Sequence, residues 1–166
     1  EQAGYTQEDM QNLTWEKYME IGKAVKEKCG VDMCTLDPSD IGQIRMMMQS
    51  AGAWYTGEDG KVTIADNDAL KDAIGVYKAL VDSGCTKQVS DWDQFVGAFN
   101  NGEVASVVTG CWIAPSIQKA EDQSGKWAVA QFPKMEANDK SVNASSIGGA
   151  GWYVLKNVGH EETAKD

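Results

Sequence analysis

The chain has 166 residues, of which 42% are hydrophobic and 24% charged, enough for one domain with a sizeable core. Its 25 acidic residues outnumber 15 dispersed basic ones, giving a net charge of −10, which argues against a nucleic-acid partner. No apolar run approaches the roughly 18 residues that a membrane span needs, and the first ten residues do not have the pattern of a signal peptide.

A helix is predicted within residues 13–30. Thr14 is its expected N-cap, and Gly30 suits its C-terminal end. Leu13 and Tyr18 have the spacing of a hydrophobic staple. Residues that recur at helical spacing mark its inner face: Trp15, Tyr18, Gly22, Val25 and Cys29.

The next stretch predicts a strand at 31–36 and a second helix within 37–52. The sequence WYTGEDGKVTI then resembles a hairpin around a turn at 57–60. On the second helix, the residues expected on the buried face are Ile41, Ile44, Met48 and Ala51.

The clearest helical pattern lies within 66–84, where the cluster at 66–68 is expected to act as a cap. A further helix begins near Ser90, which with Asp93 forms a variant of the capping box, and Gly102 closes it. For the helix within 66–84 the expected buried stripe is Leu70, Ile74, Tyr77 and Leu80 or Val81.

The remaining elements expected are strands at 104–110, 127–132 and 146–155, a short helix at 113–125 and a first helical turn at 159–166. Helices and strands alternate without an internal repeat, so we expect an α/β fold, or α+β with a small mixed sheet. Because the chain ends inside a predicted helix, residues 1–166 are expected to be a single excised domain.

The sequence contains no recognisable catalytic or metal-binding motif, so we expect neither enzyme activity nor a cofactor. The single histidine, His160, argues against zinc-hydrolase sets and a Ser-His-Asp triad. Asp91 and Asp93 are a candidate carboxylate pair, but acidic residues in a first helical turn also favour the helix dipole. The cysteines leave pairing of 29 with 34, pairing of 85 with 111, and free thiols all open: Cys29, Cys34, Cys85 and Cys111.

Six tryptophans against three phenylalanines is an unusual balance. Three of the tryptophans are interpreted as packing residues: Trp15, Trp92 and Trp127. The other three adjoin glycine-rich or turn-like breaks at the ends of elements: Trp54, Trp112 and Trp152. In open α/β folds ligands bind at such positions, and a flat aromatic face suits a sugar ring.

The order of these motifs resembles the family 1 extracellular solute-binding proteins of ABC sugar importers. TWEKYMEIGKAVKEKCG, the hairpin segment and the DALKDAIGVYKALVDSG helix occur in that order. FVGAFNNGEVASVVTGCW is similar to the family's F-x-x-G-x-x-A/S, strand, G-x-W segment, and WAVAQFPK and SIGGAGWYVLKN follow. The resemblance implies a periplasmic-binding-protein-like (type II) fold, with this chain as most of the second, C-terminal lobe.

The resemblance also implies site residues. The tryptophan of G-x-W, here Trp112, stacks on sugar in the family, and Gly148 and Gly149 match a loop whose backbone approaches the ligand. Asp40 and Arg45 follow the first strand and are expected to give charge-assisted hydrogen bonds, with a helix N-cap or a solvated surface charge as the alternative. Further candidates are Trp54 and Trp152.

The expected function is therefore capture of a sugar or oligosaccharide for import. The resemblance implies a monomer that delivers its ligand to ABC permease subunits, at the extracellular face on a lipid anchor or in the periplasm. Two alternatives remain: a carbohydrate-active enzyme using Asp91, Asp93 or Glu103, and a protein-interaction domain with exposed tryptophans.

Overall fold

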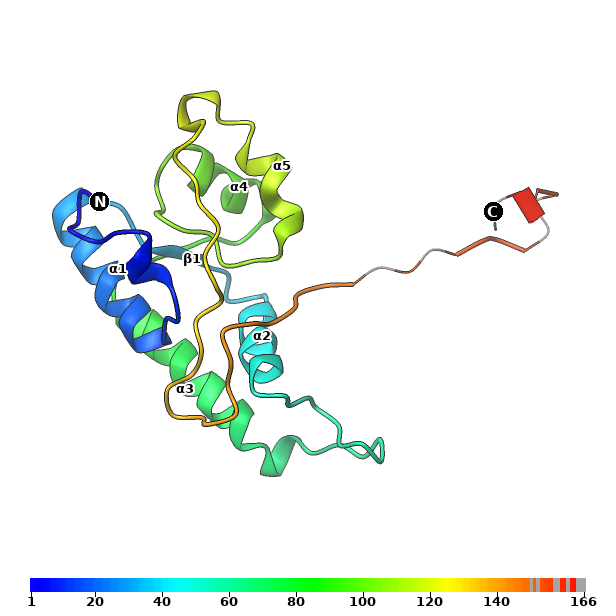
Figure 1. Ribbon diagram of the computed structural model, residues 1–166. Helices are drawn as coiled ribbons and strands as arrows, with labels where there is room; N and C mark the ends of the chain where they lie inside the picture. The colour runs from blue at the N-terminus through cyan, green and yellow to red at the C-terminus, as the bar shows by residue number, and fades with distance from the viewer. Residues whose placement is uncertain (150, 152, 157–158, 161, 164–166) are drawn as a thin grey trace.

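The structure is a computed structural model that describes residues 1–149, 151, 153–156, 159, 160, 162 and 163 (Figure 1). A two-stranded parallel sheet, β1 (Cys34–Leu36) and β2 (Thr86–Gln88), lies at its centre. The α/β class is confirmed, and the two named strands are parallel to each other. The α-helices around this sheet are α1 (Trp15–Cys29), α2 (Gly42–Ser50), α3 (Asp68–Asp82), α4 (Trp92–Asn100) and α5 (Ala114–Ile117). Single turns of 3-10 helix occur at Glu8–Met10, Ile64–Asp66, Cys111–Ile113 and Glu121–Gln123.

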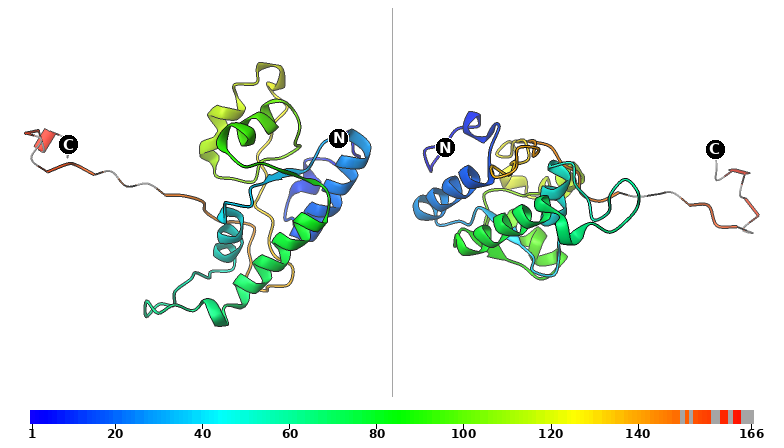
Figure 2. Two further views of the ribbon diagram at one scale, coloured as in Figure 1. Left: turned by 180° about the vertical axis from the view of Figure 1, so that it is seen from behind. Right: turned by 90° about the horizontal axis from the view of Figure 1, so that it is seen from below.

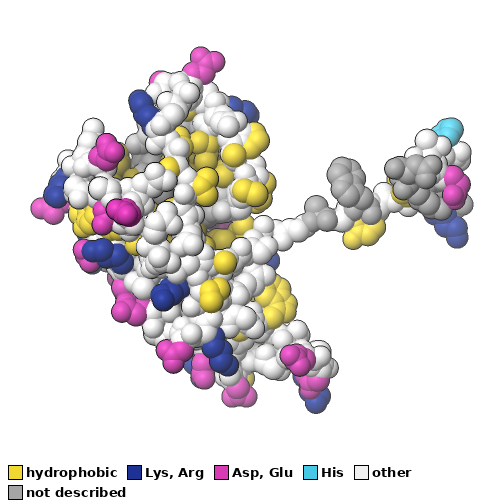
Figure 3. Space-filling model, viewed as in Figure 1, with side chains coloured by type: hydrophobic (Ala, Val, Ile, Leu, Met, Phe, Trp, Pro, Cys, Tyr) yellow, Lys and Arg dark blue, Asp and Glu magenta, His cyan; other side chains and the backbone are white. Residues whose placement is uncertain are grey.

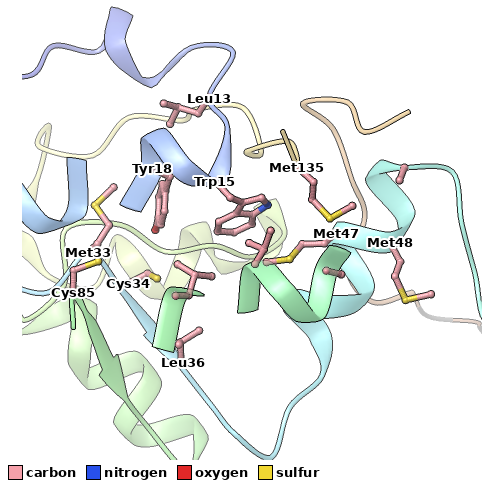
Figure 4. Packing of buried hydrophobic residues seen from close by; sticks show 14 of the residues in the cluster. Leu13, Trp15, Tyr18, Met33, Cys34, Leu36, Met47, Met48, Cys85 and Met135 are labelled. Atoms are coloured by element: carbon pink, nitrogen blue, oxygen red, sulfur yellow. The ribbon is translucent and has the colours of Figure 1, made fainter. Parts of the chain in front are cut away.

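The long helices α1 and α3 lie side by side, whereas α4 and α5 form a separate group beyond the sheet (Figures 1 and 2). The main core lies between α1, α2, α3 and β1 (Figure 4). Trp15 is fully buried there, with edge-on ring contacts to Tyr18 and Phe132 at centroid distances of 5.4 Å. A second, smaller core surrounds α4 and contains Phe99, Val104 and Ile113.

The predicted helix ends are largely confirmed. The Thr14 hydroxyl oxygen accepts a hydrogen bond from the Lys17 N–H, and Gly30 ends α1 with a φ of 74°. Asn67, within the expected cap at 66–68, accepts from the Leu70 N–H at the start of α3. For α4 the prediction was wrong by one residue, since Asp91 rather than Ser90 is the N-cap and accepts from the Gln94 N–H.

The buried faces of two helices differ from the predicted ones. On α3, Ile74 and Val81 are about half exposed, and the inward row is Ala69, Ala73, Val76 and Leu80. The small alanines of this row permit close packing against the neighbouring helices. On α2, Ile41 is exposed while three consecutive methionines, 46–48, are buried. Met47 and Met48 lie in the main core, and a second segment, 141–147, runs along α2. Ser145 Oγ donates to the Met46 carbonyl, and the Ser141 and Ser50 hydroxyls are 2.8 Å apart.

Three predicted strands are wrong in the part of the chain that the structure describes. Within 104–110 only the first residues pair with another segment. The Ala105 N–H donates to the Asp32 carbonyl, and the Ser106 N–H donates to the Met33 carbonyl. Residues 127–132 form no strand, and the pairing occurs at Lys134, which exchanges backbone hydrogen bonds with the 13–15 segment. The described residues of 146–155 form no strand either. The hairpin is reduced to one antiparallel bridge, Thr56 with Val62, around the predicted turn.

Candidate functional site

The candidate site lies at the carboxyl edge of the parallel sheet. Leu36 and Gln88 are register partners at the ends of β1 and β2. Helix α2 begins shortly after β1 and α4 shortly after β2, so both helix N-termini lie at this edge. In open parallel sheets this is the edge where ligands bind, because loops and helix N-termini converge there.

Two tryptophans form a stacked pair beside the α4 N-terminus. The ring centroids of Trp92 and Trp112 are 5.9 Å apart, with an interplanar angle of 24°, and each residue is 52% exposed. Trp92 also contacts Phe95, whose ring meets the buried Phe99 edge-on at 5.5 Å. Figure 3 shows hydrophobic side chains gathered over the α4–α5 part of the molecule. Trp92, interpreted as a packing residue, does pack on two rings, but it is half exposed and so also extends the aromatic surface outward.

Trp112 lies tightly over the backbone of Gly110. A β-carbon built on Gly110 would be 2.5 Å from Trp112 Nε1 and 3.3 Å from the Ile147 side chain. Ile147 also lies 3.0 Å from the position that a β-carbon of Gly42 would take. Ile147 therefore bridges the start of α2 and the loop that carries Trp112, bringing the two halves of the edge together.

Asp40 and Arg45 lie on the α2 side of this edge. Asp40 Oδ1 accepts from the Gly42 N–H at 2.8 Å and is 3.8 Å from an Arg45 guanidinium nitrogen. Their side chains are 58% and 44% exposed, so each has hydrogen-bonding capacity that faces water. Asp40 accepts a hydrogen bond from the first residue of α2 but is not its N-cap, which is Ile41. The alternative of solvated surface charges fits the exposure of both side chains, which also form an ion pair with each other.

Other polar groups surround Asp40. The Ser39 hydroxyl and N–H donate to the Asp37 carboxylate, and these bonds lower the pKa of Asp37. Burial, together with the carboxylates of Asp37 and Asp40, raises the pKa of Tyr77 on α3. The edge of the site therefore has negative charge on its α2 side, with Arg45 as the adjacent cation.

Gly148 and Gly149 follow Ile147 with φ values of 84° and 156°, which favour glycine. The space around both is open, since β-carbons built there would meet no atom within 4 Å. Trp54 is 42% exposed and packs on Tyr55, but it follows the C-terminus of α2. It is thus separated from Asp40 by the length of that helix, about 13 Å. Trp152 lies outside the described residues.

Two of the three carboxylates considered for enzymatic chemistry have structural roles. Asp91 caps α4, and Glu103 forms an ion pair with Lys87 at 3.2 Å. Within the described residues no cluster of His, Cys, Asp and Glu could hold a metal ion. All four cysteines are free thiols, with Cys34 and Cys85 buried and Cys111 exposed. No helix in the described ranges has both the length and the apolar character needed to cross a bilayer.

Both tryptophans of the stacked pair are half exposed. Two hollows, of about 360 and 470 Å³, lie elsewhere: one beside Asn101 and Trp127, the other between Glu16 on α1 and Asp82 on α3. Neither includes Trp92 or Trp112.

Comparison with known proteins gives consistent relationships. A family model described as bacterial extracellular solute-binding protein matches residues 4–166. The lactose-binding protein of Rhizobium radiobacter is 44% identical over 166 residues, covering all of this chain and 39% of that protein. The arabinooligosaccharide-binding protein of Bacillus subtilis is 28% identical, covering 99% of this chain and 38% of the relative.

Solved structures show the same architecture. The GacH receptor of Streptomyces glaucescens, studied unliganded and with acarbose, matches 82% of this chain and 35% of its own with a TM-score of 0.69 and 25% identity. An ABC-transporter-associated binding protein of B. animalis subsp. lactis matches 98% of this chain and 40% of its own with a TM-score of 0.77. At 24% identity the latter supports the fold alone. The chain thus spans well under half the length of the proteins that it matches.

Proposed function

Since this chain belongs to the family of bacterial extracellular solute-binding proteins, we propose that it is the carbohydrate-binding part of a protein that serves an ABC importer. Within that protein it forms most of the second, C-terminal lobe of a two-lobe structure. The observation that carries the proposal is the half-exposed Trp112 at the carboxyl edge of the sheet. The lactose-binding relative, 44% identical along the entire chain, supports a sugar as the ligand.

The proposed mechanism is non-covalent capture. The exposed face of Trp112 stacks on a sugar ring, whose C–H bonds face the π-system. Asp40 and Arg45 hydrogen-bond the hydroxyls, and the open backbone at Gly148 and Gly149 allows close approach. Trp54 and Trp152 remain candidates for contacts further along an oligosaccharide. The other lobe closes over the sugar because the closed form gains contacts with it.

The partner proposed for the closed protein is the pair of permease subunits of the importer, which bind the two lobes at their closed spacing. This places the protein outside the cytoplasmic membrane, in the periplasm or held by a lipid anchor. ATP is hydrolysed by other subunits, so the proposal requires no nucleotide site in this chain.

Tryptophan fluorescence of the full-length protein tests the proposal. The panel is lactose, an arabinooligosaccharide and acarbose, titrated against wild type, Trp112→Ala and Trp127→Phe. Trp127 is the matched control, because it belongs to the same α4 group but its Nε1 donates to Gln123, away from the site. We expect saturable quenching by one sugar class, retained in Trp127→Phe and lost in Trp112→Ala. No response to any sugar would contradict the proposal.

The same titration, with analysis of the sugar afterwards, separates the alternatives. Turnover would indicate an enzyme. The half-exposed tryptophan pair is also what a protein-interaction domain predicts, and that alternative is favoured if neither binding nor turnover of any sugar occurs.

A further inference from the structure

The indole of Trp112 is restrained on two sides. One face is stacked against Trp92, and its Nε1–Cδ1 edge lies over Gly110, where a β-carbon would come within 2.5 to 2.6 Å of both atoms. The side chain is nevertheless half exposed. This combination leaves one ring face for a ligand and little freedom for the ring to rotate.

Trp92 is itself fixed by a line of aromatic contacts that leads into the second core. It is the first residue of α4, directly after the Asp91 cap. Its ring is tilted against Phe95 at 5.6 Å, and Phe95 meets the fully buried Phe99 edge-on. The contacts therefore run from Phe99 through Phe95 and Trp92 to Trp112, from the core to the surface.

A structural role alone does not account for Trp92. A tryptophan that served only to fill the second core would be buried, whereas Trp92 is 52% exposed and reaches past Phe95 to the surface. Its outward contact is the ring of Trp112, on a different segment 20 positions further along the chain. The contact of the two rings is thus the feature that requires an aromatic side chain at position 92.

We propose that Trp92 is a positioning residue, which holds Trp112 so that the site takes a sugar ring by stacking on one face only. The inference rests on the proposed function, because it assigns Trp112 to the sugar. Its physical basis is preorganisation: a ring that is already immobile loses no further rotamer freedom when the ligand binds. An aromatic pair contributes enough to change affinity by about threefold to tenfold.

The test uses the full-length protein with Trp92→Ala, Trp92→Phe and, as the control, Trp127→Phe. Each position-92 variant is also made in combination with Trp112→Ala. Subtracting the near-UV circular dichroism spectrum of the double variant from that of the single variant isolates the signal of Trp112, and the measurement needs no sugar. Far-UV spectra verify that all variants are folded. Lactose is the probe for affinity.

We expect the Trp112 signal to persist in Trp92→Phe, since an aromatic ring remains, and to fall below about half in Trp92→Ala, where the indole is free to turn. Lactose affinity should fall about threefold to tenfold in Trp92→Ala and recover in Trp92→Phe. Trp127→Phe should match wild type in affinity.

Equal Trp112 signals in the alanine and phenylalanine variants would overturn the inference, as would unchanged lactose affinity in Trp92→Ala. If wild type binds no sugar, the proposed function fails on its own. The sugar-free difference spectra then still decide, by the same comparison, whether Trp92 positions Trp112.

Discussion

Gly110 and Trp112 are packed so closely that a β-carbon on Gly110 would lie 2.5 Å from Trp112 Nε1. The backbone of Gly110, with φ −76° and ψ 159°, is one that alanine adopts freely, so the constraint is steric. The glycine is therefore required at this position by the ring of the tryptophan rather than by the backbone.

Gly110→Ala should displace the Trp112 ring without unfolding the protein. Sugar affinity in the full-length protein is expected to fall about tenfold, while the free energy of unfolding changes by less than about 1 kcal/mol because the ring is half exposed. Gly97→Ala on α4 is the control, since a β-carbon there meets only Asn101 Nδ2, at 3.8 Å. Fluorescence titration and urea unfolding check both, and tight binding by Gly110→Ala would contradict the prediction.

Gly22→Ala should destabilise the main core. A β-carbon at position 22 would lie 2.8 Å from both Cys85 Sγ and Met33 Cβ, and overpacking of this kind costs about 1–3 kcal/mol. Gly75→Ala on α3 should instead stabilise by about 0.5–1 kcal/mol, because the space there is open and alanine favours the helix. The urea midpoints of the two variants should therefore shift in opposite directions relative to wild type. Shifts of the same sign would contradict the packing described for Gly22 and Gly75.

Substitutions at Trp15 should differ strongly in cost. Trp15→Ala leaves a large cavity and is expected to cost about 3–5 kcal/mol. Trp15→Phe should cost only about 1–2 kcal/mol, because it keeps a ring against Tyr18 and Phe132 and also removes a buried polar group. In the described part of the chain Trp15 Nε1 has no hydrogen-bond partner. Equal losses in denaturant midpoint for the two variants would contradict the prediction, because they would mean that a ring at position 15 adds nothing to the core.

The stability of the protein should fall in alkaline solution. Burial raises the pKa of the Cys34 thiol from 9.0 to about 12, so the folded state keeps a proton that the unfolded state releases above pH 9. The stabilisation is fully present below pH 9 and is lost as the pH rises toward 12, by at most about 1.4 kcal/mol per pH unit. Burial also raises the pKa of Tyr18, which acts in the same direction.

Cys34→Ala tests this pH dependence. Its unfolding free energy, measured from pH 8 to 11, should decline less steeply than that of wild type. An identical slope in the two proteins would mean that the Cys34 thiol does not contribute.

The ends of helices could be predicted from the sequence because capping is local. Thr14 and Asn67 each bond a backbone N–H three residues ahead, so the spacing in the sequence specifies the contact. The strands could not be predicted in this way. Whether 104–110 or 127–132 pairs depends on distant partners, and Lys134 finds its partner in the 13–15 segment instead.

The candidate site was predictable only in part. Trp112 was singled out by its place at a break beside the end of an element and Asp40 through the resemblance, and their proximity to the sheet edge follows from the order of strand and helix. Trp92 was missed although a signal was present: Trp92, Phe95 and Phe99 form a row at helical spacing that leads from the surface to the core. The contact of Trp92 with Trp112 depends on how the loop at 110–113 folds back, and no local sequence pattern specifies that.

The backbone hydrogen bonds of Lys134 with Leu13 and Trp15 also have a consequence for folding during synthesis. The partners of Trp15 in the core include Phe132 and Met135, which follow it by about 120 residues. At the usual 5–20 residues per second, a ribosome needs roughly 6–24 s to make that stretch. During this interval α1 emerges with its large aromatic face uncovered. The packing of α1 is thus completed only by residues made much later, so a nascent chain interrupted before residue 132 should be especially prone to aggregate.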